Sequence, residues 1–447
     1  MKTGKTAFYL VCLTAALAIL PIASFPGMPE GHYELSRFIA PEVCGGCHDT
    51  IYEQWKNSLH HLAQSDRVYR AAAFYYLEGL TDRDEIAEAE SCVKCHTPVG
   101  FFSGFPVKTS EEKEGKVAGI AAQGVQCDFC HSATGARTLF NNNILLDPGH
   151  GESRPGTKRG PFADSRSDYH VSAHSKFHTG PEICAVCHDV RHVVYGTKLE
   201  TTYEEWQASP YNSADSSKRL VCQDCHMYQR PGIPATGSTK RPKNPGLASA
   251  DGPAREHVFT HFFVGGNSFI PSGSGDKVKA AMAVERLQNA AVLDLDVSAA
   301  RAGSIVVTVK NTGAGHSLPT GLTDVRQVWL QVRVTDESGA PVFETGVPDA
   351  NGYLPDGTIL YNTVFGDGKG NPVENIAKAR EVLKNRRVPA GGSLYETISV
   401  SPLAGKRFFV EAKLLYAVAS QKLLDRVAGK GTIRVPIVTM AEIKKSI

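Results

Sequence analysis

The sequence has little net charge, few aromatic side chains and almost no cysteine outside one repeated pattern. A formal net charge of +2 over 447 residues gives no electrostatic basis for binding nucleic acid. Only 8% of the residues are aromatic, while 42 glycines and 25 prolines indicate a chain rich in loops. After residue 26, no stretch is long and apolar enough to span a membrane. These deficits argue against a nucleic-acid-binding protein and against a protein that crosses the membrane repeatedly.

The first 26 residues have the pattern of an export segment. Lys2 and Lys5 precede an apolar run from Ala7 to Ala23, as in a secretory signal peptide. A run of about 17 residues lies at the lower limit for a spanning helix, so an uncleaved membrane anchor is the alternative. With either, we expect the remaining chain outside the cytoplasm, in the periplasm or at the cell surface.

Ten of the 11 cysteines lie in five copies of Cys-x-x-Cys-His, and only Cys12 is left over. In chain order, the copies define sites 1 to 5: Cys44-Gly-Gly-Cys47-His48, Cys92-Val-Lys-Cys95-His96, Cys127-Asp-Phe-Cys130-His131, Cys184-Ala-Val-Cys187-His188 and Cys222-Gln-Asp-Cys225-His226. In this motif the two thiols bond covalently to haem c, and the histidine becomes the proximal iron ligand. A zinc knuckle, a disulfide pair or a redox dithiol would not require a histidine after every second cysteine. We therefore expect five covalently attached haem c groups.

Each haem iron has a sixth coordination position, and its occupant distinguishes an electron carrier from a catalyst. Only five methionines are present, so a second histidine is the expected distal ligand, which gives low potentials. Eleven histidines remain after the five motifs are subtracted: His32, His60, His61, His150, His170, His174, His178, His192, His257, His261 and His316. A helix predicted over residues 51–62 would display His60. Four-residue spacing would place the histidines at 170, 174 and 178 on one helix face.

The composition changes after site 5, which indicates two domains behind the export segment. We expect a signal peptide or anchor at 1–26, a mostly-α, loop-rich pentahaem cytochrome c domain at 27–275 and a β domain at 276–447. Residues 82–90 and 276–289 predict helices. Alternating or β-branched residues predict strands at 292–297, 304–311, 325–334, 394–400, 408–418 and 433–440. Short strands separated by turn signals favour an immunoglobulin-like β-sandwich.

Several segments resemble the multihaem c-type cytochromes related to the tetrahaem cytochrome that accepts electrons from hydroxylamine oxidoreductase. The matching segments are Cys44-Gly-Gly-Cys-His with Tyr52, Trp55, Ser58 and His60, then Gly124-Val-Gln-Cys-Asp-Phe-Cys-His131, Thr202-Tyr-Glu-Glu-Trp-Gln-Ala-Ser209, Cys222-Gln-Asp-Cys-His-Met227, His261-Phe-Phe-Val-Gly-Gly-Asn267 and Gly313-Ala-Gly-His-Ser-Leu-Pro-Thr-Gly321. The resemblance covers roughly residues 40–440. It implies a set of distal ligands, with two residues in reserve: His60, His170, His178, His261 and His316, then His174 and His257.

Three functions are compatible with this sequence, and no residue is assigned a catalytic role. First, motif starts only 48, 35, 57 and 38 residues apart favour closely packed haems that relay electrons between redox partners, such as donor and acceptor cytochromes or a quinol-oxidising membrane protein. Second, one open haem would make an oxidoreductase for a small nitrogen or sulfur compound. The catalytic motif of pentahaem nitrite reductases usually ends in lysine, whereas every motif here ends in histidine. Third, a distal histidine donated across an interface would build an oligomer. The surplus histidines favour the carrier over the catalyst.

Overall fold

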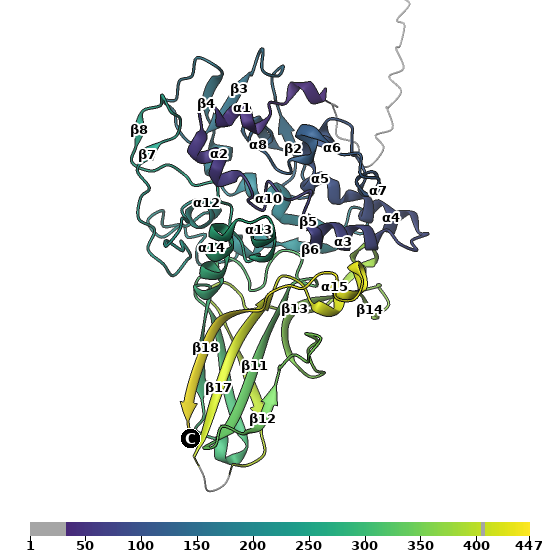
Figure 1. Cartoon of the computed structure of the whole chain (residues 1–447), viewed down its shortest axis with the longest axis vertical. Helices are drawn as coiled ribbons and strands as arrows, with labels where there is room; N and C mark the ends of the chain where they lie inside the picture. Colours follow the sequence, from purple (N-terminus) through teal and green to yellow (C-terminus); the bar gives the residue numbers. More distant parts are fainter. Residues whose placement is uncertain (1–32, 404–406) are drawn as a thin grey trace, which may run out of the picture.

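The computed structural model describes residues 33–403 and 407–447, so the predicted export segment at 1–26 lies outside the described residues. Figure 1 shows a region of short helices and loops above a region of long strands, with the C-terminus at the lower end. The predicted order, a helical region followed by an all-β region, is confirmed. The boundary between residues 275 and 276 and the immunoglobulin-like assignment stay predictions.

Short helices and two-stranded sheets make up the first region. The helices are α1 (Pro41–Gly45), α2 (Asp49–Trp55), α3 (Arg67–Tyr76), α4 (Arg83–Ala89), α5 (Val93–His96), α6 (Pro98–Phe102), α7 (Thr109–Lys113), α8 (Cys127–His131), α9 (Lys176–Thr179), α10 (Glu182–His188), α11 (Thr202–Gln207), α12 (Cys222–His226) and α13 (Phe269–Gly273). The strand pairs are β1 (Ala133–Ala136) with β2 (Ile144–Leu146), β3 (Thr157–Gly160) with β4 (Val171–His174), β5 (Asp189–Arg191) with β6 (Lys198–Thr201) and β7 (Gly246–Leu247) with β8 (Ala254–Arg255). Helix α3 begins where the Asp66 carboxylate accepts hydrogen bonds from two backbone amides, and Asp82 caps α4 in the same way.

Two predicted helices differ from the structure. The helix predicted over 51–62 ends at Trp55, because Lys56 leaves helical geometry and Asn57 adopts a φ of 59°. His60 therefore lies in the turn that follows the helix. The predicted stacking of three histidines before site 4 is wrong, because residues 171–174 form strand β4, and α9 begins only at Lys176.

The second region begins with α14 (Lys277–Gln288), which confirms the predicted helix at 276–289. Its strands are β9 (Ala291–Asp296), β10 (Ser304–Asn311), β11 (Gln327–Asp336), β12 (Pro341–Thr345), β13 (Ile359–Gly366), β14 (Pro372–Val373), β15 (Glu381–Arg386), β16 (Ser393–Ser399), β17 (Phe408–Ala417) and β18 (Val438–Ser446), with helix α15 (Gln421–Ala428) before the last strand. One sheet has the order β16-β10-β9. The larger sheet has the order β14-β13-β11-β17-β18, with β12 paired to β11 and β15 paired to β13.

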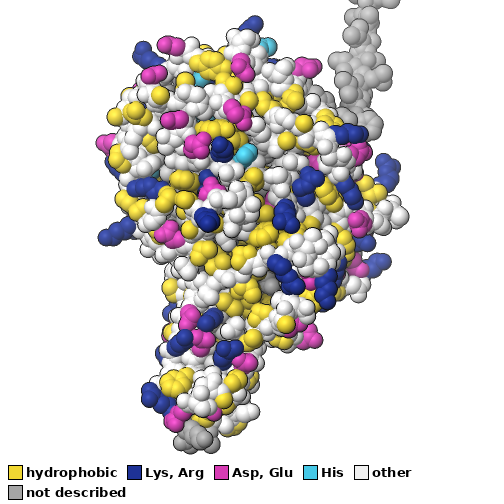
Figure 2. All heavy atoms as spheres, viewed as in Figure 1, with side chains coloured by type: hydrophobic (Ala, Val, Ile, Leu, Met, Phe, Trp, Pro, Cys, Tyr) yellow, Lys and Arg dark blue, Asp and Glu magenta, His cyan; other side chains and the backbone are white. Residues whose placement is uncertain are grey.

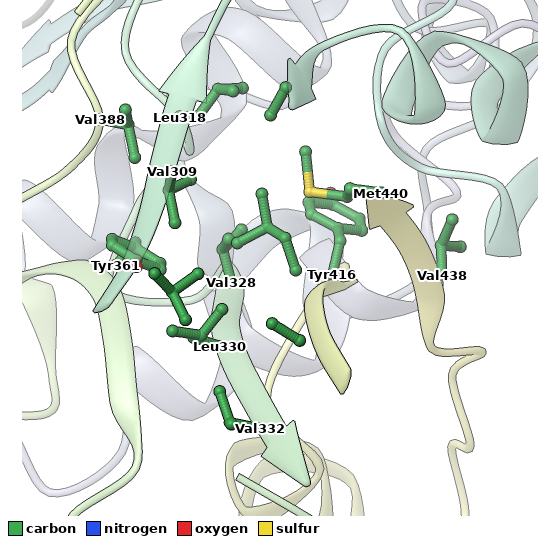
Figure 3. Close-up of a cluster of buried hydrophobic side chains, with 14 of the residues drawn as sticks. Val309, Leu318, Val328, Leu330, Val332, Tyr361, Val388, Tyr416, Val438 and Met440 are labelled. Carbon is green, nitrogen blue, oxygen red and sulfur yellow. The ribbon is translucent and has the colours of Figure 1, made fainter. Parts of the chain in front are cut away.

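Strand β11 explains how the core of this region is built. Its side chains alternate, so Val328, Leu330 and Val332 all enter one hydrophobic cluster, while Trp329 faces a smaller cluster on the other side. Figure 3 shows the first three beside Tyr361, Tyr416 and other buried side chains from neighbouring strands. Burial of this many apolar side chains makes the β region the largest hydrophobic core in the described residues.

The β region packs directly against the first region. Val68 of α3 belongs to the same buried cluster as the strands, and Leu59 and Leu62 pack against that cluster. Helix α15 also lies against α3 (Figure 1). Within the described residues, the longest helix has 12 residues, and none has the length and apolar character needed to cross a bilayer.

Candidate functional site

A single large cavity runs through the first region and along its contact with the β region. Its volume is about 1220 Å³, which exceeds the roughly 300–1,000 Å³ of ordinary ligand pockets. All ten motif cysteines, all five motif histidines and the five predicted distal histidines line it. The reserve histidines His174 and His257 do not. The predicted site residues are therefore brought together around one space.

Four of the five motif histidines end a short helix, and at sites 3, 4 and 5 that helix also carries both cysteines. Sites 3 and 5 coincide with the five-residue helices α8 and α12, and site 4 occupies the end of α10. One helical turn places cysteines three residues apart on the same side, which suits attachment to one planar group. At site 1, helix α1 ends at Gly45, and His48 stands just before α2.

The segment before site 3 also positions His60. The Val125 amide donates to the His60 carbonyl at 2.8 Å, and the Trp55 indole donates to the Val125 carbonyl at 2.9 Å. Gly124 makes this approach possible, because its φ is 60° and a Cβ there would stand 2.2 Å from the His60 carbonyl oxygen. This contact explains the glycine in Gly124-Val-Gln-Cys.

The structure argues against the other uses of such cysteines. The ten described motif cysteines form no disulfide among themselves. Within the described residues, no group of three or more His, Cys, Asp or Glu side chains could hold a metal ion alone. At sites 2 and 3, burial raises the pKa of Cys92 and of Cys130 to about 12, whereas a redox dithiol depends on a lowered thiol pKa. At site 1, the neighbouring Cys127 lowers the pKa of Cys44. The residues fit covalent attachment of haem better than a zinc knuckle or a dithiol.

Backbone carbonyls orient most of the cavity histidines. The Nδ1 atoms of four motif histidines lie 2.6–3.0 Å from carbonyl oxygens, and since a carbonyl can only accept, Nδ1 carries the proton: His48 to Ala248, His96 to Ala63, His131 to Arg159 and His226 to Val264. Three predicted distal histidines use the same contact at 3.0–3.2 Å: His170 to Val171, His261 to Phe259 and His316 to Ser317. Each Nε2 is thereby left free to bind iron, as is usual for metal-ligating histidines.

Four motif histidines each face a second imidazole across the cavity. The ring centres lie 6.3–6.5 Å apart, and the planes are inclined by 18–31°, in the pairs His48–His170, His131–His261, His188–His60 and His226–His316. When two imidazoles bind one metal on opposite sides, their ring centres lie about 6 Å apart. Each metal–nitrogen bond contributes about 2 Å, and each nitrogen lies about 1 Å from its ring centre. The observed spacing therefore suits one iron atom between the two rings of each pair.

Burial keeps these imidazoles neutral. Together with nearby imidazoles, it lowers the pKa of His60 and of His261 to about 3. Burial likewise lowers the pKa of His226 well below its usual value. A neutral imidazole is the form that ligates a metal, so burial prepares the side chains for coordination.

His178 is the predicted distal ligand that the structure places differently. Its ring centre lies 5.7 Å from that of His131, but its Nε2 is 2.9 Å from the Cys130 carbonyl. His261 instead holds the position opposite His131 with its Nε2 free. His257 also has another role, because its Nδ1 accepts a hydrogen bond from the Asn244 amide.

Site 2 has a different environment from the other four. Among residues 33–403 and 407–447, no second imidazole pairs with His96 at the spacing seen elsewhere. The Tyr69 ring stacks on His96 instead, with ring centres 3.7 Å apart and an interplanar angle of 2°. Sequence reasoning missed Tyr69, because a tyrosine on an amphipathic helix has no local feature that distinguishes it from a core residue.

Contacts between cysteines of different motifs show which sites are neighbours. Cys127 is close enough to lower the pKa of Cys44, and Cys95 and Cys184 are close enough to raise the pKa of Cys187 and of Cys222, respectively. Cys187 is also close enough to Cys130 for their charges to interact. Site 1 therefore adjoins site 3, while site 4 adjoins sites 2, 3 and 5.

Glu205 on α11 holds the loop that carries His316. Its carboxylate accepts hydrogen bonds from the Ser317 amide at 2.9 Å and the Thr320 hydroxyl at 2.8 Å. It also pairs with Arg387 of the β region, and both side chains are less than a tenth exposed. The β region is thereby joined to the cavity through one buried ion pair.

We expect Glu205→Gln to destabilise the protein by about 3–5 kcal/mol, because Arg387 would keep a buried charge without a partner. Urea unfolding followed by circular dichroism would measure the loss. Glu204→Gln is the matched control, since the Glu204 carboxylate pairs with Lys198 and Arg191 near the surface and should contribute about 1 kcal/mol or less. Equal losses in the two variants would contradict the role given to Glu205.

Comparison with known proteins agrees with this geometry. A family model described as cytochrome c554 and c-prime matches residues 43–132, which contain sites 1 to 3. The structure is similar to that of a penta-heme cytochrome c552 from Thermochromatium tepidum, with a TM-score of 0.63 and 19% sequence identity over 93% of this chain and 100% of that chain. Comparison with curated protein sequences gives no match. The family match over residues 43–132 and the shared fold both agree with a multihaem c-type cytochrome.

Proposed function

We propose that this chain carries five haem c groups and relays electrons between redox proteins outside the cytoplasm. The observation that carries the proposal is the set of four facing imidazole pairs in a cavity lined by all ten motif cysteines. Bound haem would supply the one-electron chemistry, and the protein sets its position, axial ligands and surroundings. By this assignment, sites 1, 3, 4 and 5 have two histidine ligands each.

The contacts between motif cysteines support a branched order of sites. Site 1 leads to site 3 and then to site 4, and from there the order divides towards sites 2 and 5. The imidazole pair of site 4, His188 and His60, therefore stands at the branch point. Electrons that enter at site 1 would pass this pair before they reach either end.

Site 1 is the end best suited to a redox partner. Cys47 is exposed, and apolar side chains surround the site: Tyr169 is 44% exposed, Val171 is 63% exposed and Leu247 is 49% exposed. The last of these directly precedes Ala248, whose carbonyl holds His48. Lys, Arg, Asp and Glu side chains are spread over the face in Figure 2, which suits a small, transient contact better than a strongly charged partner. We propose that a donor or acceptor cytochrome, or a quinol-oxidising membrane protein, docks here.

Site 2 supports a second function, the oxidation or reduction of a small nitrogen or sulfur compound. The absence of a facing imidazole at His96 within the described residues would leave one haem face open. Arg326 is close enough to lower the pKa of His96 further below the value set by burial. Tyr76 and Glu200 line the same cavity, and the buried Tyr76 hydroxyl has no hydrogen-bond partner among the described residues. Such groups could bind a polar ligand and carry protons.

Carbon monoxide binding to the fully reduced protein tests both functions. We expect one CO per chain, because only site 2 offers an open coordination position. Rapid binding at that ratio supports ligand chemistry at site 2 in addition to the relay. No binding would remove the second function and leave the electron carrier alone, whereas binding at several sites would contradict the assignment of the four imidazole pairs.

We infer that the export segment places the cytochrome in the periplasm or at the cell surface, with membrane association through residues 1–26 as the alternative. A relation to the acceptor of hydroxylamine oxidoreductase, and oligomer formation, stay predictions. The cavity already contains four imidazole pairs within one chain, so the relay does not depend on a histidine from a second copy.

A further inference from the structure

His96 differs from the other four motif histidines in what covers its ring. Those four each face an imidazole at 6.3–6.5 Å, whereas His96 lies flat against Tyr69 at 3.7 Å. The Ala63 carbonyl accepts a hydrogen bond from His96 Nδ1 at 3.0 Å, so the imidazole is fixed both at its edge and on its face. Within the described residues, His96 is also the one motif histidine that lacks a facing imidazole.

Tyr69 is in turn bonded to a buried carboxylate. Its hydroxyl donates to Glu112 Oε2 at 2.8 Å, and the hydroxyl of Thr97, the residue after His96, donates to Oε1. Glu112 and Thr97 are both 0% exposed. Burial raises the pKa of Glu112, and the hydrogen bonds from Thr97 and Tyr69 oppose that rise. Because both carboxylate oxygens accept hydrogen bonds, the geometry fits the ionised form of Glu112. A negative charge is thus held inside the protein, one side chain away from the ligand of site 2.

The chemical consequence follows from electrostatics in a poorly screened interior. A phenol that donates to a carboxylate carries more electron density, and stacking brings that density against His96. Negative charge beside the proximal ligand favours the ferric over the ferrous state, because it stabilises the more positively charged iron and makes the ligand more basic. Burial strengthens the effect, because little water lies between Glu112 and the ring.

We propose that Tyr69 and Glu112 are positioning residues that fix the His96 ring and hold the haem at site 2 at a lower potential than an unsupported histidine would give. This inference rests on the proposed attachment of haem at site 2. Through the potential, the two residues would set how readily site 2 receives an electron from site 4. The potential of site 2 would thereby be set separately from the potentials of the four sites with paired imidazoles.

Two substitutions separate charge from hydrogen bonding. Glu112→Gln removes the charge and keeps an oxygen that accepts from Tyr69, whereas Tyr69→Phe keeps the stacked ring and removes the hydrogen bond. Tyr75→Phe is the matched control, because Tyr75 lies on the same helix and packs against a different cluster. Spectroelectrochemical titration of the intact protein, followed at the absorption of the CO-sensitive haem, measures the potential of site 2.

We expect the ferric–ferrous equilibrium of site 2 to shift about tenfold towards the ferrous state in Glu112→Gln, which corresponds to about 59 mV. We expect a smaller shift in the same direction in Tyr69→Phe, and no change in Tyr75→Phe or at the other four sites. An unchanged site 2 potential in both variants would overturn the proposal, as would an equal shift at every site. If the wild-type protein binds no CO, the open face fails, but the proposal is still tested, because one of the five potentials should rise in Glu112→Gln and Tyr69→Phe and not in Tyr75→Phe.

Discussion

Replacing His316 with alanine should double the number of high-spin ferric haems, from one to two in each chain. His316 faces His226 at 6.5 Å, and its Nδ1 is held by the Ser317 carbonyl, so its Nε2 is the only imidazole nitrogen opposite site 5 in the described residues. Its loss leaves that iron with one strong axial ligand. Electron paramagnetic resonance of the ferric protein, integrated against total iron, would measure the change.

The control for this experiment is His257→Ala. His257 is also a histidine near site 5, but it is bonded to the Asn244 amide and does not line the cavity. Its spectrum should match that of the wild type. Carbon monoxide provides a second measurement, because reduced His316→Ala should bind two CO per chain. A spectrum of His316→Ala with unchanged low-spin content would contradict the placement of the β region over site 5.

Replacing His60 with methionine should make site 4, the branch point, retain electrons and so slow their transfer to the neighbouring sites. Methionine opposite histidine raises a haem potential, and axial ligands as a group shift potentials over about 0.8 V. We expect the potential of site 4 to rise by on the order of 100 mV, which slows electron escape to its neighbours about 50-fold at about 59 mV per tenfold change. Stopped-flow reduction, followed at the CO-sensitive haem, would measure how fast electrons reach site 2.

His61→Met is the matched control for His60→Met. His61 is adjacent in sequence, yet its Nδ1 accepts a hydrogen bond from the Asn57 amide, and its ring lies against Trp55 rather than in the cavity. Electron arrival at site 2 should therefore be unchanged in His61→Met. Equal rates in His60→Met and the wild type would contradict the central position of site 4, even if the potential of that site had risen.

The cysteines and motif histidines could be identified from sequence because the chemistry fixes their spacing. Thioether attachment needs two thiols three residues apart and an adjacent imidazole, so the pattern is local and repeats unchanged. The distal histidines lack such a rule. His170 lies directly before β4 and His60 lies in a turn, so neither lies on the helix predicted for it. What brings them to the cavity is long-range packing, which periodicity does not encode.

The sequence also does not show which of His178 and His261 faces His131. Both lie close to His131, but they differ in ring spacing and in the nitrogen that is bonded: His178 uses Nε2 at a spacing of 5.7 Å, and His261 uses Nδ1 at a spacing of 6.4 Å. Tyr69 was missed for a related reason. Its contact with His96 joins two segments that are unremarkable when read separately.

The strands of the β region were easier to predict where one face is buried. Strands β10, β11 and β17 are rich in buried β-branched and other apolar residues, and all were predicted within a few residues. Strand β15 was missed because its six residues are largely exposed and carry no apolar alternation. The last strand was predicted at 433–440 but runs from Val438 to Ser446, since polar residues at its exposed end hide the period.

Denaturing intact-mass spectrometry of the mature protein tests the central claim most directly. Thioether bonds survive unfolding, so a chain produced with cytochrome maturation should keep the mass of five haem groups, and peptide mapping should assign one to each of sites 1 to 5. A chain with fewer than five attached groups, or a colourless chain without added mass, would contradict the account of the cavity and of everything assigned to its paired imidazoles.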